Sequence, residues 1–211
     1  MIPETAEGVL PHKTESEQAL LGRAPHQVIR AKIAAAYLYA DDADPSVWRG
    51  LSERRVNYDE TIDRTGPLVL RTVRFNLEMG RFAIDELGER AYVQAVHSED
   101  DPDLIIDILA WSATRPYLYG TFFGHAGLLG GDAVLNPASF KEAPCPIWAS
   151  PLAWLQTSLR GAVVLNAELA APILARAPGL FQCEDADHAR WLVQSGAVAV
   201  EKLMVPARTA A

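Results

Sequence analysis

Cysteine is scarce in this sequence. Only Cys145 and Cys183 occur among the 211 residues, and no C-x-x-C pair is present. A cysteine-based zinc site or a dithiol redox pair is therefore not indicated. We expect both cysteines to be reduced, buried and unreactive, because acidic residues follow Cys183 and prolines flank Cys145.

Long apolar runs and a secretory leader are also lacking. The longest apolar candidate, 117–131, is shorter than the roughly 20 residues that a bilayer span needs, and it carries His125. The first residues, MIPETAEGVLPHK, have neither a basic nor an apolar region of the secretory type. We therefore expect a cytoplasmic protein that does not enter a membrane.

The chain has no excess of positive charge. Its 19 lysines and arginines against 27 aspartates and glutamates give a net charge of −8. Such a chain repels a phosphate backbone, so we expect no nucleic-acid partner. Hydrophobic residues at 49% and charged residues at 22% are ordinary for a globular protein.

Signatures of known catalytic chemistry are missing too. The sequence contains no G-x-x-x-x-G-K-[ST] phosphate loop, no G-x-S-x-G nucleophile elbow and no H-E-x-x-H zinc motif. No cofactor or bound metal is predicted on these grounds.

The N-terminal part favours helices. Residues 1–14 show no periodicity and are expected to form a tail, whereas apolar residues at spacings of three and four predict a helix near 25–40. Asp44 and Pro45 suit the start of a short helix. Alternation over 73–79 predicts a half-buried strand, and 80–88 is ambiguous between strand and helix.

Two apolar segments, 91–97 and 104–111, flank the turn-forming sequence SEDDPD and predict an antiparallel hairpin. The acidic residues in and after this turn do not fit a calcium loop, so we expect a solvated turn. They are Glu99, Asp100, Asp101, Asp103 and Asp107.

The last third alternates strands with helices, which indicates right-handed βαβ units. The expected strands are 145–148, 161–165, 180–183 and 202–206; the expected helices are 150–160, 166–177, with an interruption near Pro172, and 184–196. The predicted fold is mixed α/β, with a C-terminal βαβαβ parallel portion, an antiparallel hairpin and a helical N-terminal portion. We expect one domain over 15–211, with a subdivision into 15–90 and 91–211 left open.

The segment YGTFFGHAGLLGGD (119–132) contains five glycines. If 116–131 is a helix, then Gly120, Gly124 and Gly127 fall within about 60° of each other on one face. Such a face suits a close backbone approach, either to the protein's own sheet or to a partner or second subunit, and a loop is the alternative. His125 is expected to be structural.

Polar residues follow three of the expected parallel strands, and they share one rim if these strands are neighbours. The rim residues are Ser150, Asn166, Glu184, Asp185, Asp187 and His188. Glu184, Asp185, His188 and Ser150 are the catalytic candidates, through acid–base or metal chemistry. Alternatively, these residues cap helices. Trp148 and Trp154 bracket Ser150 and serve either core packing or a pocket.

Two functions remain open from the sequence. The first is a non-enzymatic accessory or regulatory protein that acts through a protein partner or self-association, with Gly120, Gly124 and Gly127 as the interface. The second is a small enzyme or ligand-binding domain whose acidic site lies at the carboxyl ends of the parallel strands.

Overall fold

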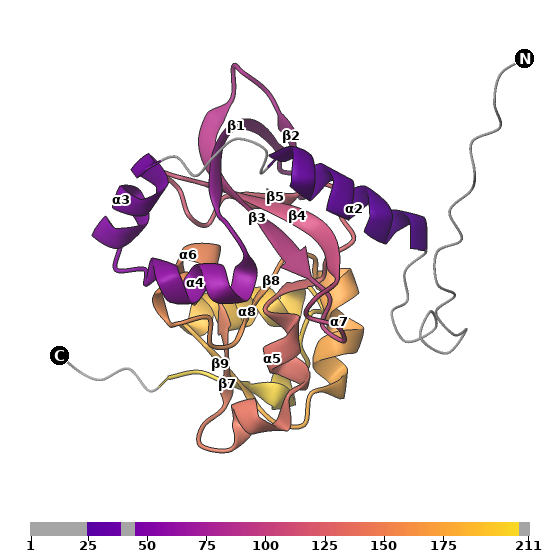
Figure 1. Cartoon of the computed structure of the whole chain (residues 1–211). Helices are drawn as coiled ribbons and strands as arrows, with labels where there is room; N and C mark the ends of the chain where they lie inside the picture. Colours follow the sequence, from indigo (N-terminus) through magenta and orange to yellow (C-terminus); the bar gives the residue numbers. More distant parts are fainter. Residues whose placement is uncertain (1–24, 39–44, 207–211) are drawn as a thin grey trace, which may run out of the picture.

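The computed structural model describes residues 25–38 and 45–206, and it contains two sheets with helices around them (Figure 1). The mixed α/β class predicted from the sequence is confirmed. The predicted tail over 1–14 and the Asp44 cap lie outside the described residues. Within the described part, no helix combines the length and apolar content that a bilayer crossing requires.

Three helices come first: α2 (Pro25–Leu38), α3 (Pro45–Glu53) and α4 (Tyr58–Thr65). The predicted helix near 25–40 is therefore confirmed for its described part. The helix α4 was not predicted. Its sequence, YDETIDRT, is mostly polar, and among its described side chains Thr61, Ile62 and Thr65 face the protein interior.

The first sheet closes into a small barrel in the order β1-β2-β5-β4-β3. Its strands are β1 (Val69–Asn76), β2 (Arg81–Ile84), β3 (Glu89–His97), β4 (Ile105–Ser112) and β5 (Tyr119–Thr121). The antiparallel pairing of β3 with β4 confirms the predicted hairpin. Residue 90 lies inside β3, so a subdivision at that point would cut the barrel.

The strand predicted at 73–79 was misplaced. In the structure β1 begins at Val69, and Leu77 and Met79 are exposed in the turn that leads to β2. Alternating apolar residues predict a buried strand face only where a neighbouring layer covers that face, and nothing in the described chain covers this turn.

The second sheet has the order β10-β9-β7-β8-β6. Its strands are β6 (Leu128–Leu129), β7 (Cys145–Trp148), β8 (Ala162–Val164), β9 (Phe181–Cys183) and β10 (Leu203–Met204). The pairs β7–β8, β7–β9 and β9–β10 are parallel, as predicted, and β6 adds an antiparallel edge.

The helices of this half are α5 (Gly131–Leu135), α6 (Pro151–Gln156), α7 (Ala167–Arg176) and α8 (Ala186–Gln194), with two short 3-10 turns, η1 (Pro137–Phe140) and η2 (Val200–Lys202). Despite the predicted interruption, α7 runs on through Pro172. The helices α7 and α8 pack on the sheet face that carries Ile147 and Phe181, and α6 packs on the opposite face near Val163.

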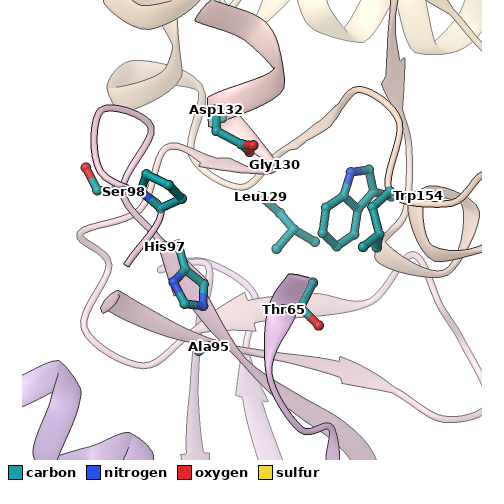
Figure 2. Close-up of a pocket in the computed structure, with 11 residues that line it drawn as sticks. Thr65, Ala95, His97, Ser98, Leu129, Gly130, Asp132 and Trp154 are labelled. Carbon is teal, nitrogen blue, oxygen red and sulfur yellow. The ribbon is translucent and has the colours of Figure 1, made fainter. Parts of the chain in front are cut away.

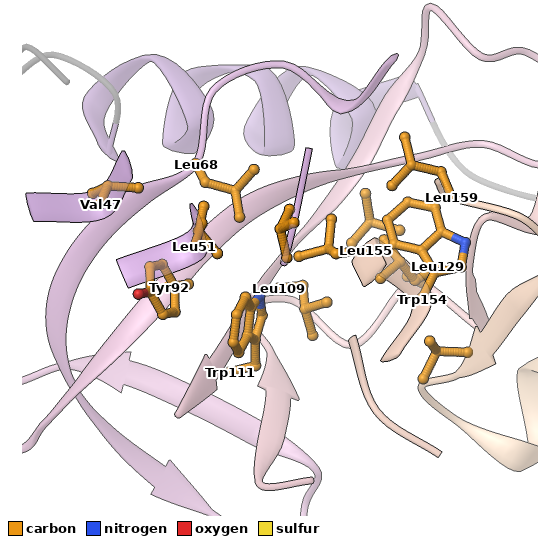
Figure 3. Packing of buried hydrophobic residues seen from close by; sticks show 14 of the residues in the cluster. Val47, Leu51, Leu68, Tyr92, Leu109, Trp111, Leu129, Trp154, Leu155 and Leu159 are labelled. Carbon is orange, nitrogen blue, oxygen red and sulfur yellow. The ribbon is translucent and has the colours of Figure 1, made fainter. Parts of the chain in front are cut away.

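One buried cluster joins the two sheets. Figure 3 shows side chains from α3, such as Leu51, beside Tyr92 and Trp111 of the barrel, and these continue to Trp154 of α6. Tyr92 and Trp111 are cross-strand partners whose rings stack with centroids 4.4 Å apart. The barrel and the α/β half therefore share a core.

The predicted helix over 116–131 is wrong. This segment forms β5, a loop over 122–127, β6 and the start of α5. The loop wraps around the fully buried carboxylate of Asp107, which accepts hydrogen bonds from the backbone N–H groups of Phe123, His125 and Ala126 at 2.8, 2.6 and 3.2 Å. Amides that a helix would bond to its own carbonyls bond instead to this carboxylate.

Asp107 also corrects the expectation of a solvated acidic turn. Its side chain is inaccessible to solvent and belongs to β4, not to the turn before it. Asp100, by contrast, makes an ion pair with Arg176 at 3.2 Å, with both side chains partly exposed.

The glycines of the loop therefore do not form one helical face. A Cβ atom at Gly120 would lie 2.8 Å from the backbone of Arg81, and one at Gly127 would lie 2.7 Å from the backbone of Leu169 in α7. Gly124 has φ +69° and lies against the Arg81 side chain. The close approach expected at these glycines is made by the same chain. The prediction of an interface at Gly120, Gly124 and Gly127 therefore no longer has a helical glycine face to support it.

Candidate functional site

The strand order of the second sheet contains a topological switch point. From β7 the chain passes through α6 to β8 on one side, whereas from β9 it passes through α8 to β10 on the other side. Because β7 and β9 are parallel neighbours, a crevice is expected outside their carboxyl ends. In open α/β sheets this is where ligands bind.

A groove of about 660 Å³ reaches this place, and we name it the switch-point groove. It runs along one face of the sheet, from Ala143 and Pro144 before β7 to Trp148 and Glu184 at the carboxyl ends of β7 and β9. Its principal lining residues are Pro146 and Trp148 of β7, Gln182 and Glu184 at β9, and Thr157 and Arg160 after α6. This volume lies within the roughly 300–1,000 Å³ of small-molecule sites.

Two side chains of the groove are held by backbone contacts. The Trp148 indole Nε1–H donates to the carbonyl of Arg160 at 2.7 Å, and Glu184 Oε1 accepts from the N–H of Ala149 at 2.8 Å. The second bond joins the end of β9 to the end of β7, across the switch point. Both contacts fix polar or aromatic groups in the absence of any ligand, which lowers the entropic cost of binding.

The strands that carry the predicted rim are neighbours in the sheet, as the prediction required, but three of the six rim residues act as helix caps. Ser150, Asn166 and Asp185 accept hydrogen bonds from the backbone N–H groups at the starts of α6, α7 and α8. Asp187 forms an exposed ion pair with Arg190 at 2.7 Å. Of the four catalytic candidates, Glu184 is the one that lines the switch-point groove.

His188 lies in α8, largely buried, with its ring stacked on Trp191. Burial lowers the pKa of its imidazole, and the nearby carboxylates of Glu184 and Asp185 oppose that shift only in part. A neutral imidazole against the sheet serves packing better than proton transfer in the groove.

The two thiols are poor nucleophiles. Burial raises the pKa of Cys145 to about 11, and burial together with Asp185 raises the pKa of Cys183 to about 11. Both are free and buried, as expected for structural cysteines. Among residues 25–38 and 45–206, no cluster of three His, Cys, Asp or Glu side chains is suited to hold a metal ion.

A second, smaller cavity lies between the barrel and the α/β half (Figure 2). It has a volume of about 60 Å³ and is lined by Thr65, His97, Leu129, Asp132 and Trp154, among others. Both ring nitrogens of His97 are buried there and bond no group of the described chain. The cavity is large enough for water but too small for an ordinary organic ligand.

The sequence predicted part of the switch-point groove. Glu184 and Trp148 were considered as site residues, and Trp154 turned out to be a core residue whose Nε1–H donates to Gly161. Arg160 and Gln182 were missed. A basic residue at a helix end and a polar residue in a three-residue strand are common on any surface, so neither carries a signal by itself.

The comparisons with known proteins leave the groove as the main guide to function. No protein-family model, no curated protein and no solved structure matches this chain.

Proposed function

We propose that this protein binds a small polar molecule in the switch-point groove. The observation that carries the proposal is a groove of about 660 Å³ that reaches the carboxyl ends of β7 and β9, where their chain connections diverge. Its fixed Trp148 and Glu184 side chains support binding. Since both cysteines are free thiols, we also propose a reducing compartment such as the cytoplasm.

The test is a ligand screen by NMR on ¹⁵N-labelled protein, with a panel of neutral and charged metabolites. Binding is expected to shift the Trp148 indole and Ala149 amide signals, which report on the floor and the rim of the groove. The variant Gln182→Trp fills the groove from an exposed position on β9. The matched control, Gln194→Trp, adds the same bulk to an exposed position on α8.

Hits that bind the wild type and Q194W but not Q182W are the expected result. A panel without hits, or hits that still bind Q182W with undiminished affinity, would count against the groove as the binding site.

Contact with a protein partner is a second candidate function, and a separate surface favours it. The β1–β2 tip, which we define as Leu77 and Met79, exposes 71% and 65% of these apolar residues. Large apolar side chains gathered at an exposed tip are typical of contact surfaces. The simplest partner is a second copy of the chain.

Light scattering after size-exclusion chromatography tests this second function. Self-association is expected to raise the measured mass with protein concentration in the wild type, but not in a variant with Leu77→Asp and Met79→Asp. A wild-type mass that stays monomeric across the concentration range would remove the second copy as the partner.

A further inference from the structure

Two opposite charges lie in the switch-point groove without pairing with each other. Arg160 and Glu184 both line it and both are exposed, yet no ion pair joins them within the described chain. They are the charged members of the lining that the structure describes. Two opposite charges that do not pair with each other complement a ligand that carries both signs.

The exposed guanidinium of Arg160 has no ion-pair partner among the described residues. A guanidinium offers several N–H donors in a fixed plane, which suits carboxylate and phosphate oxygens. The backbone carbonyl of Arg160 is bonded to Trp148, so this residue is tied at its main chain to the aromatic floor of the groove.

Glu184 supplies the opposite charge. Its Oε1 atom is occupied by the Ala149 N–H, which leaves the other carboxylate oxygen available to accept a hydrogen bond from a ligand. The exposed amide of Gln182, two residues before Glu184, adds both a donor and an acceptor.

Trp148 and the prolines of the groove favour a flat ligand. The indole is fixed by its hydrogen bond, and Pro144, Pro146 and Pro206 line the same groove with rigid rings. Rigid aromatic and proline surfaces lose little conformational entropy when they bind a flat, partly apolar ring.

We infer that the switch-point groove selects a planar ring compound that bears both an anionic group and an amine or another N–H donor. In this arrangement the ring lies against Trp148, the anionic group pairs with Arg160 and the donor pairs with Glu184. An aromatic amino acid and a purine mononucleotide both have this chemistry. The inference rests on the proposed function and narrows it to a ligand class.

Two probe series separate these sources. The first comprises L-tryptophan, tryptamine without the carboxylate, and indole-3-propionate without the amine. The second comprises adenosine monophosphate and adenosine. Each is titrated into ¹⁵N-labelled wild type and into Arg160→Gln, Glu184→Gln and Arg190→Gln, the last being a control arginine on the exposed face of α8.

At least one of the two complete probes, L-tryptophan or adenosine monophosphate, is expected to shift the Trp148 indole signal. R160Q should lower the affinity for that probe about tenfold or more and leave the affinity for tryptamine or adenosine unchanged. E184Q should lower the affinity for probes that carry an amine and leave the affinity for indole-3-propionate unchanged. R190Q should change none of these affinities.

The ligand class is overturned if neither complete probe binds up to 10 mM, or if R160Q binds the anionic probes as tightly as the wild type does. The proposed function survives either result if other members of the metabolite panel bind the wild type and fail to bind Q182W. Failure of the ligand class and failure of the groove are thus distinguished.

Discussion

A single carboxylate, that of Asp107, organises the glycine-rich loop. It accepts hydrogen bonds from three backbone N–H groups of the loop and, at 2.8 Å, from the N–H of Ile108. It is inaccessible to solvent. The N–H donors offset the cost of burying this side chain, and without it the loop amides would be left without partners. The loop conformation therefore depends on this side chain.

Replacement of Asp107 by Asn is expected to lower the free energy of unfolding by about 3 kcal/mol or more. The Asn amide retains one acceptor oxygen but directs its own N–H donors at backbone N–H groups. Urea denaturation followed by circular dichroism measures the change. Asp103→Asn, an exposed neighbour, should stay within about 0.5 kcal/mol of the wild type. Equal losses for both variants would show that the loop amides do not depend on Asp107.

His188 predicts a pH dependence of stability. Because its folded pKa is lowered by burial from the ordinary value of 6.5, the fold prefers the neutral ring. Its contribution is fully present above that ordinary value and is lost as the pH falls through it toward the folded pKa. One proton corresponds to at most about 1.4 kcal/mol per pH unit.

Between pH 7 and pH 5, the wild type is therefore expected to lose more unfolding free energy than His188→Phe, which keeps a ring against Trp191 but cannot take up a proton. Urea midpoints at several pH values measure both curves. The two proteins differ only at His188, so parallel curves would mean that His188 is not held neutral by the fold.

At the scale of elements, the α/β half is built from strand ends that cap the following helices. Ser150, Asn166 and Asp185 each leave a parallel strand and bond the first turn of the next helix. These local contacts made β7 to β10 and α6 to α8 predictable from sequence, because both the periodicity and the cap lie within a few neighbouring residues.

Ser150→Ala is expected to cost about 1 kcal/mol of stability through loss of the α6 cap. Ser150→Asp should restore most of this loss, because aspartate caps a helix equally well. Thermal unfolding measures both variants. If Ser150 were instead a nucleophile, S150A would leave the melting temperature unchanged.

Close packing against α7 leaves no room for a side chain at Gly127, which directly precedes β6. A Cβ atom there would lie 2.7 and 2.8 Å from backbone atoms of Leu169 and Ala170. Gly127→Ala is therefore expected to destabilise by about 2–3 kcal/mol, since backbone must shift. Gly196→Ala, at φ +74° with open space around it, should cost only the backbone strain of about 1–2 kcal/mol. A smaller loss for G127A than for G196A in urea denaturation would contradict the close approach.

At the scale of the whole molecule, the barrel and the α/β half are joined by contacts as well as by the shared core. Tyr119 in β5 donates its hydroxyl to the carbonyl of Val164 in β8 at 2.9 Å. The N–H groups of Leu165 and Asn166 both donate to the carbonyl of Gly127. Buried side chains from both halves pack against one another at this junction (Figure 3).

We therefore expect the two halves to unfold in one transition. With 5-fluorotryptophan incorporated, the ¹⁹F signals of Trp111 in the barrel and Trp148 in the α/β half should disappear at the same urea concentration. Tyr119→Phe should lower both midpoints together, by about 1 kcal/mol of stability. Separate midpoints, or a shift confined to one signal, would indicate that each half folds independently.

The sequence by itself determined the mixed α/β class, the β3–β4 hairpin and the parallel order of the last third, because these depend on local periodicity and turn residues. Only the tertiary structure decided the barrel, the loop around Asp107 and the groove at the switch point. Asp107 meets the 122–127 loop about 16 residues downstream, and Glu184 meets Ala149 35 residues away. Contacts between distant segments depend on closure of the whole fold, which no short stretch of sequence specifies.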